Sequence, residues 1–307
     1  GEGAGLWVGM PLLGALVSAS FVNLNTLTQR ISDARQGLAN SIYRGCFSAT
    51  AILAPILVTR LASVWSGYPP VLLVLAGILI ASAAILFRYP GERPLGSAGG
   101  AWATCQRMWA DYREAVRNRP LMRMIHVTQV WFACVAAVFT FAAIRFTQDL
   151  GVTDERFGEF SAAAGVMTML GVLSTGLFLD KVSIRRFSTL CAIIAAACCL
   201  TMGLTDSVAV SAVAFIVFGP MHMMIAGPVS MWVSRAAGES SQTSAFTVHK
   251  VVTAAYMAVG VASLGFLESW LGMRMVFLIS GIVAILTGAG FQFLSEPPPP
   301  RLREDDS

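Results

Sequence analysis

The chain has 307 residues, of which 56% are hydrophobic and only 12% are charged. Soluble domains carry about 25% charged residues, so this composition is typical of a membrane protein. The net charge is +4, but the 21 basic residues are scattered through short loops beside apolar runs. That pattern excludes nucleic-acid binding as a main function. The six cysteines and three histidines show no metal-ligating spacing, so we expect no metal site and no cofactor.

Apolar runs that are long enough to cross a bilayer follow one another along the whole chain. A membrane-spanning helix needs about 20 apolar residues, and the alternation typical of strands is missing. The predicted fold class is therefore all-α, a polytopic membrane helix bundle with about nine transmembrane helices. The runs cover residues 6–27, 37–60, 69–87, 121–144, 158–179, 188–205, 208–233, 246–268 and 274–294.

The basic residues give the orientation of these runs. Alternate loops hold sixteen lysines and arginines and the opposite loops hold four, with Arg44 inside a run. Basic residues collect on the cytoplasmic side of a membrane. We therefore expect the C-terminal Ser307 to be cytoplasmic and the loop near Trp65 to be outside. The expected location is the bacterial inner (cell) membrane.

The long loop before Leu121 carries an amphipathic pattern. Apolar residues recur at three- and four-residue steps, opposite a row of arginines. We interpret this segment as a helix on the cytoplasmic membrane surface, in contact with lipid, that joins two bundles. A solvated linker is the alternative. The apolar positions are Trp102, Cys105, Trp109, Tyr112 and Val116, and the arginines are Arg107, Arg113 and Arg117.

Internal similarity also indicates two bundles. The second run aligns with the eighth, so that Tyr43 pairs with His249 and Arg44 with Lys250. Repetition of one half in the other around a central loop is typical of secondary transporters.

The loop after the fifth run resembles a known family motif. It reads Gly176-Leu-Phe-Leu-Asp180-Lys181-Val-Ser183-Ile-Arg185-Arg186 and is similar to the cytoplasmic loop motif of the major facilitator superfamily, with Ser183 in place of the usual second glycine. We expect Gly176 to permit close helix approach. Asp180 and the basic residues Lys181, Arg185 and Arg186 would form a gating loop that controls switching between inward and outward states.

The resemblance implies twelve spans in two six-helix halves, whereas three runs precede the central loop here and six follow it. We therefore expect the chain to correspond to family helices four to twelve and to lack the first three. On this mapping residues 1–90 are the remainder of an N-terminal bundle and 91–120 are the linker. Residues 121–296 form a C-terminal six-helix bundle, and 297–307 are a cytoplasmic tail.

Polar side chains inside the runs are candidates for a substrate cavity, because such groups are costly in lipid and face the bundle interior. The resemblance implies that the first, fourth and seventh runs line this cavity. His126 and Gln129 lie three residues apart, near Trp131, and we expect them on one helical face. The full set of cavity candidates is Asn23, Asn25, Arg44, His126, Gln129, His222, Lys250 and Tyr256.

His222 stands between two Gly-Pro pairs, Gly219-Pro220 and Gly227-Pro228. We expect these pairs to break or kink the helix and to free carbonyl groups. The imidazole could titrate or bind substrate, or it could be a structural group held by a hydrogen bond. A Cu(I) site with the adjacent methionines is a further interpretation, although neighbouring residues on a helix point in different directions.

Arg44 and Lys250 are the basic residues well inside the runs, and acidic residues are nearly absent there. The two cations could bind an anion together, or they could be anchors that snorkel or pair with Asp33 or Asp180. The leading hypothesis is a secondary transporter that moves a small solute, in particular a small organic anion, by alternating access. A proton or another co-ion is a candidate partner.

Three other functions stay open. A proton-coupled drug or metabolite efflux pump is the first, but the two glycines of the family's antiporter pattern are replaced here by Thr50 and Ala54. A membrane-embedded enzyme would need clustered catalytic groups, which the sequence does not show, so we expect no enzyme activity. A non-transporting scaffold fragment is the third.

Overall fold

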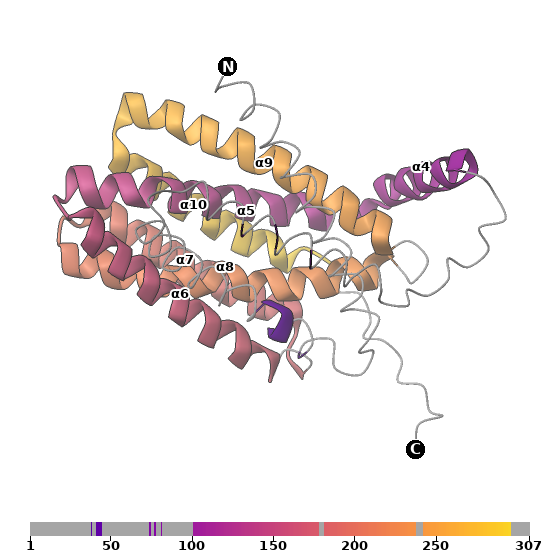
Figure 1. The fold of residues 1–307 in the computed structure, drawn as a ribbon, viewed down its shortest axis with the longest axis horizontal. Coiled ribbons are helices and arrows are strands. Elements are labelled where there is room, and N and C mark those ends of the chain that lie inside the picture. The colour runs from indigo at the N-terminus through magenta and orange to yellow at the C-terminus, as the bar shows by residue number, and fades with distance from the viewer. Residues whose placement is uncertain are drawn as a thin grey trace.

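The computed structural model describes residues 38, 41–44, 74, 77, 81, 101–177, 181–237 and 242–295. In these residues it shows helices and no strand, which confirms the predicted all-α bundle. Six helices are long and apolar enough to cross a membrane, and they lie side by side in Figure 1. The helices are α4 (Ala101–Arg117), α5 (Arg119–Ile144) with the π-helix η1 (Arg145–Asp149), α6 (Asp154–Gly176), α7 (Ile184–Leu204), α8 (Val208–Ala237), α9 (Gln242–Leu271) and α10 (Met273–Gln292).

Each predicted run after residue 120 corresponds to one of these membrane-spanning helices, with ends that differ by a few residues. The first three runs lie outside the described residues, apart from helical positions at 38, 41–44, 74, 77 and 81. The predicted division into two bundles, a linker and a tail therefore stays a prediction.

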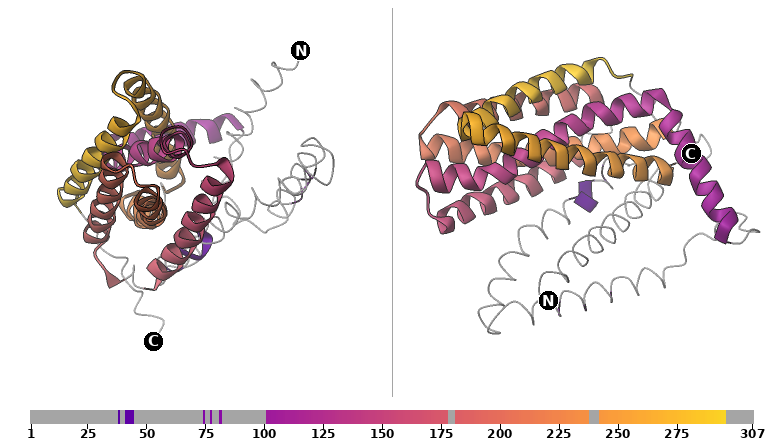
Figure 2. Two further views of the ribbon diagram at one scale, coloured as in Figure 1. Left: turned by 90° about the vertical axis from the view of Figure 1, so that its left-hand side faces the viewer. Right: turned by 90° about the horizontal axis from the view of Figure 1, so that it is seen from above.

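The segment predicted to be amphipathic is the helix α4, which projects away from the bundle (Figure 1, Figure 2). Trp109 on this helix is 56% exposed, stacks on Tyr112 with 5.5 Å between ring centroids, and lies under the Arg113 guanidinium. Asn118 then caps α5, because its side chain accepts a hydrogen bond from the Leu121 amide. Contact of α4 with the membrane surface remains a prediction.

Small residues set the closest helix contacts inside the bundle. The helix α7 packs along α10 and α8, α6 packs on α8, and α5 packs on α9 and α10. A Cβ atom added at Gly281 would lie 2.7 Å from Leu200 Cγ, and one at Gly203 would lie 2.8 Å from Leu278 Cδ2. Such close approach stabilises helix pairs in lipid, where no hydrophobic effect drives them together.

The helix α8 runs without a break through both proline positions, Pro220 and Pro228. The Gly-Pro pairs therefore do not break the helix, and a kink at them stays a prediction. Each proline removes one backbone hydrogen bond, but packing against α6 holds the helix: a Cβ at Gly219 would lie only 3.1 Å from Ala164 Cβ. Membrane helices tolerate proline where a neighbouring helix supports the chain in this way.

Charged side chains join three helix ends at one end of the bundle. Arg145, which is 3% exposed, forms ion pairs with Asp149 (2.9 Å) and Asp206 (3.0 Å) and donates a hydrogen bond to the Thr205 carbonyl. Asp206 also pairs with Arg274. Arg145, followed by Arg274, holds the pKa of the Asp206 carboxyl below its usual value. We call Arg145, Asp149, Asp206 and Arg274 the arginine–aspartate clamp.

Candidate functional site

The segment at residues 41–44, from the second predicted run, docks on the six-helix bundle beside α6 and α8 (indigo in Figure 1). Its Arg44 side chain is buried, with 6% exposure. Arg44 Nη2 donates a hydrogen bond of 2.6 Å to Ser230 Oγ of α8. Arg44 Nε has no hydrogen-bond partner among the described residues. Within these residues, its N–H group is therefore available to a ligand.

The positive charge of Arg44 interacts electrostatically with side chains from two helices of the bundle, namely His222 on α8 and His249 and Lys250 on α9. The charge of Lys250 interacts with His249 as well. The structure therefore gathers Arg44 and Lys250, which the sequence repeat had paired, in one region. We call Arg44, His222, Ser230, His249 and Lys250 the basic cluster.

Positive side chains that approach one another in a membrane protein repel, and burial removes the water that would screen them. In the described part of the chain, no carboxylate forms an ion pair with Arg44. A cluster of this kind can hold an anion, because an arginine guanidinium presents several donors in a planar fork that matches a carboxylate or a phosphate.

Close contact between the second run and α6 occurs at Gly176, the first residue of the loop motif. A Cβ atom at this position would lie 2.6 Å from Ser41 Cβ and 3.3 Å from Leu38 Cα. Only a residue without a side chain fits there, so Gly176 determines how closely the second run and α6 approach each other. The same helix contains Gly158, where an added Cβ would meet nothing within 4 Å.

The other residues of the predicted gating loop are only partly described, since Asp180 lies outside the described residues. Lys181 and Arg186 are exposed. Arg185 Nη1 donates to the Gln292 carbonyl at 3.3 Å, which ties the start of α7 to the end of α10. Ser183, the departure from the family motif, caps α7 by accepting a hydrogen bond from the Arg186 amide.

His126 and Gln129 have different surroundings. His126 is exposed, and its Nδ1 shares a hydrogen bond of 2.9 Å with the Tyr256 hydroxyl. Gln129 is completely buried and donates to Thr128 Oγ1. The structure thus brings His126 and Tyr256 together as a pair between α5 and α9 and leaves Gln129 inside the bundle. Asn23 and Asn25 lie outside the described residues.

His222 is held within its own helix, because Nδ1 donates to the Gly219 carbonyl at 2.8 Å. Its ring stands edge-on to Phe139, with 5.1 Å between centroids. Met224 lies against α6, since a Cβ added at Gly171 would be 3.0 Å from Met224 Sδ. These contacts favour a structural role for His222 over ligation of copper.

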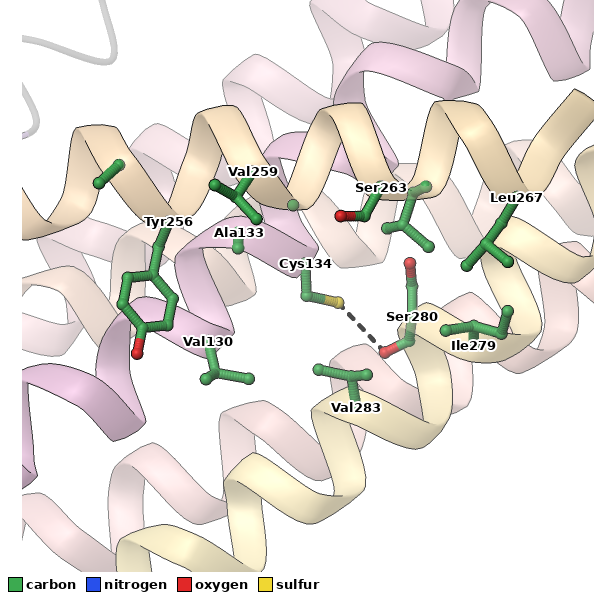
Figure 3. A pocket seen from close by; sticks show the side chains of 13 residues that line it. Val130, Ala133, Cys134, Tyr256, Val259, Ser263, Leu267, Ile279, Ser280 and Val283 are labelled. Carbon is green, nitrogen blue, oxygen red and sulfur yellow. Dashed lines mark hydrogen bonds between the residues drawn. The ribbon is translucent and has the colours of Figure 1, made fainter.

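A separate apolar pocket of about 470 Å³ lies between α5, α9 and α10 (Figure 3). Val130, Val259 and Val283 line it, and Tyr256 stands at one end. Cys134 Sγ donates to the Ser280 carbonyl at 3.1 Å across the pocket. The lining carries no charge, so the pocket suits an apolar group and is chemically different from the basic cluster.

Two members of the basic cluster were not predicted as site residues. The sequence repeat indicates His249 only as the partner of Tyr43, next to Lys250. Ser230 gave no signal, because a serine in a membrane helix commonly bonds its own backbone, and Ser230 also donates to the Ala226 carbonyl.

Comparison with known proteins gives the family. The model of the Major Facilitator Superfamily matches residues 4–261. A search of curated proteins finds no match. With its six apolar helices the chain is an integral, multi-pass membrane protein, and members of this family are secondary transporters of solutes rather than enzymes. From the match over most of its length, the chain belongs to the Major Facilitator Superfamily.

Proposed function

We propose that this transporter moves a small organic anion that carries a carboxylate, and that the anion binds at the basic cluster. The observation that carries this proposal is the burial of the Arg44 guanidinium, whose hydrogen-bond partner among the described residues is the neutral Ser230 hydroxyl. A buried charge without a counter-charge is costly by several kcal/mol. An anionic substrate would remove that cost while it is bound.

The position of the cluster supports a role in transport. Arg44 belongs to the second run, whereas Ser230 and Lys250 belong to the six-helix bundle, so an anion held among them would contact both moving parts. A ligand can bias an equilibrium between two states only if it binds them with different affinity. An anion that bridges the two parts meets this requirement, because its contacts change when the parts separate.

The proposal includes three finer points. The transporter works by alternating access, with the Gly176–Arg186 loop as its gate. The C-terminus is cytoplasmic and the protein resides in a bacterial inner membrane, as the distribution of basic residues suggests. A proton or another co-ion moves with the substrate.

The proposal is tested with the protein reconstituted in vesicles. Uptake of radiolabelled lactate and benzoate is compared with uptake of their uncharged amides. We expect saturable uptake of at least one carboxylate and none of its amide. Arg44→Gln and Lys250→Gln should each raise the KM at least tenfold, which is about 1.4 kcal/mol of lost binding.

The matched control is Arg156→Gln, which removes an arginine from the exposed start of α6 and should leave the KM unchanged. Uptake that survives the double change of Arg44 and Lys250 would contradict the proposal. It would leave both residues as structural anchors.

A further inference from the structure

The three histidines of the chain have different partners. His126 shares a hydrogen bond with Tyr256, and His222 donates to its own helix. His249 is buried, with 7% exposure, yet neither Nδ1 nor Nε2 has a hydrogen-bond partner among the described residues. Buried polar groups are nearly always hydrogen-bonded, so a histidine with two orphan nitrogens points to a ligand.

The described surroundings of His249 contain no group that would accept a hydrogen bond from a charged imidazole. The described charges that interact with it are those of Lys250 on its own helix and Arg44 from the second run. Both are cations, and neither can accept a hydrogen bond from the imidazole. On the α5 side His249 meets the ring of Phe132 edge-on, at 6.4 Å between centroids. From α8, the titratable member of the cluster is His222, whose Nδ1 is already committed to Gly219.

We propose that His249 is a ligand of the transported anion and takes up one proton when the anion binds. This inference rests on the proposed function. A carboxylate oxygen would accept a hydrogen bond from one ring nitrogen, and a proton from solution would occupy the other. The imidazole becomes imidazolium, no covalent bond breaks, and the added positive charge balances the negative charge of the anion.

The coupling follows from electrostatics. A further positive charge near the buried Arg44 is unfavourable while the cluster is empty. A bound anion offsets that repulsion, so proton and anion bind cooperatively, and each raises the affinity for the other by the same factor. When the anion leaves, the repulsion returns and the proton leaves with it. The transporter therefore moves anion and proton together.

The test measures protons taken up per anion bound. Purified protein at pH 7.5 is titrated with sodium lactate or sodium benzoate in two buffers that differ in ionisation enthalpy. Both probes are fully ionised at this pH, so they release no proton on binding. Any proton that is taken up from the buffer therefore binds to the complex. We expect about one proton per anion for the parent protein. The His249→Gln variant should bind more weakly and take up no proton.

The matched control is His126→Gln, which also removes one histidine but leaves the cluster intact, and its proton uptake should equal that of the parent. If His249→Gln does not fold, the number of protons taken up per anion is compared between the parent and His249→Asn instead. Binding by the parent without proton uptake, or proton uptake retained in a His249 variant, overturns this inference and leaves the anion site standing. Absence of saturable binding of either probe by the parent would overturn the anion site as well.

Discussion

Arg44 and Arg145 are both buried in this bundle, but their charges are balanced differently. Arg145 meets two carboxylates, Asp149 and Asp206, and a backbone carbonyl. Among the described residues, Arg44 donates to a serine hydroxyl, and the charged or titratable groups that interact with it are Tyr43, two histidines and a lysine. No carboxylate contacts it among the described residues. The charge of Arg145 is therefore balanced by carboxylates of the folded chain, while Arg44 has no such counter-charge among the described residues.

The difference separates structural charge from functional charge. An ion pair that is satisfied by the chain holds helix ends together and gains nothing from a ligand. A buried cation without an acid costs stability in the empty protein, and a substrate can recover that cost. The same residue type is thus a clamp at one end of the bundle and, on the proposed function, a binding group between the second run and α8.

Replacing each arginine with methionine gives the largest expected contrast. Arg145→Met should lower the free energy of unfolding by about 2 kcal/mol, because the clamp loses its buried cation and Thr205 loses a donor. Arg44→Met should leave stability unchanged or raise it in the absence of anion, because it removes a buried charge that pairs with no carboxylate of the described residues. Thermal unfolding of both variants in the same detergent, followed by tryptophan fluorescence, measures the contrast. Equal losses for the two variants would remove the distinction.

The docking of the second run can be tested at Gly176. Gly176→Ala would place a Cβ 2.6 Å from Ser41 Cβ, so the second run and α6 could not approach each other to the observed distance. We expect the transport rate to fall about tenfold, with little change in the stability of the six-helix bundle. Gly158→Ala on the same helix meets nothing within 4 Å and should transport normally. A normal rate in both variants would show that close approach at Gly176 is not required.

Acid should weaken the clamp in a predictable range. Because Arg145 and Arg274 lower the pKa of Asp206 below its ordinary value of 3.8, the carboxylate stabilises the folded state at pH values above that ordinary value. The stabilisation is lost as the pH falls through the lowered pKa of the folded state. The melting temperature of Asp206→Asn should therefore lie slightly below that of the parent at pH 7 and pH 5. The difference should shrink as the pH falls further below 3.8; a difference that grows on acidification would contradict this sign.

The smallest effect is expected at the exposed pair of His126 and Tyr256. Its hydrogen bond is 2.9 Å long, but both groups lie outside the basic cluster, and exposed polar pairs contribute little. Tyr256→Phe should change the KM for a carboxylate less than about twofold. A tenfold rise in transport assays would place Tyr256 in the binding site after all.

The positions of the six membrane helices could be predicted because a bilayer fixes the length of an apolar run, whatever the neighbouring helices are. Helix ends were less accurate: α8 and α9 are each 30 residues long, beyond their apolar runs. The continuity of α8 could not be predicted either. Local preference at Pro220 favours a break, and only the contact of Gly219 with α6 shows why the helix persists.

The site could be predicted in part. The repeat related Arg44 to Lys250, and the structure places both in one electrostatic field. Sequence spacing does not reveal which faces of α8 and α9 turn toward the second run, so Ser230 and His249 were not recognised. His126 and Gln129 illustrate the same limit, because residues three apart on a helix lie close together and can still differ in burial.

The binding of an anion to the resting protein tests the role of Arg44 most directly. The melting temperature of the purified protein is measured against increasing benzoate and against increasing benzamide, which has a similar shape and no charge. A ligand at a hundred times its Kd stabilises by about 2.7 kcal/mol, a shift that is easily detected. We expect a saturable rise with the carboxylate, none with the amide, and no rise with either in Arg44→Gln. Equal rises with both compounds, or a carboxylate effect that persists in Arg44→Gln, would contradict the assignment of Arg44 as the group that binds the anion.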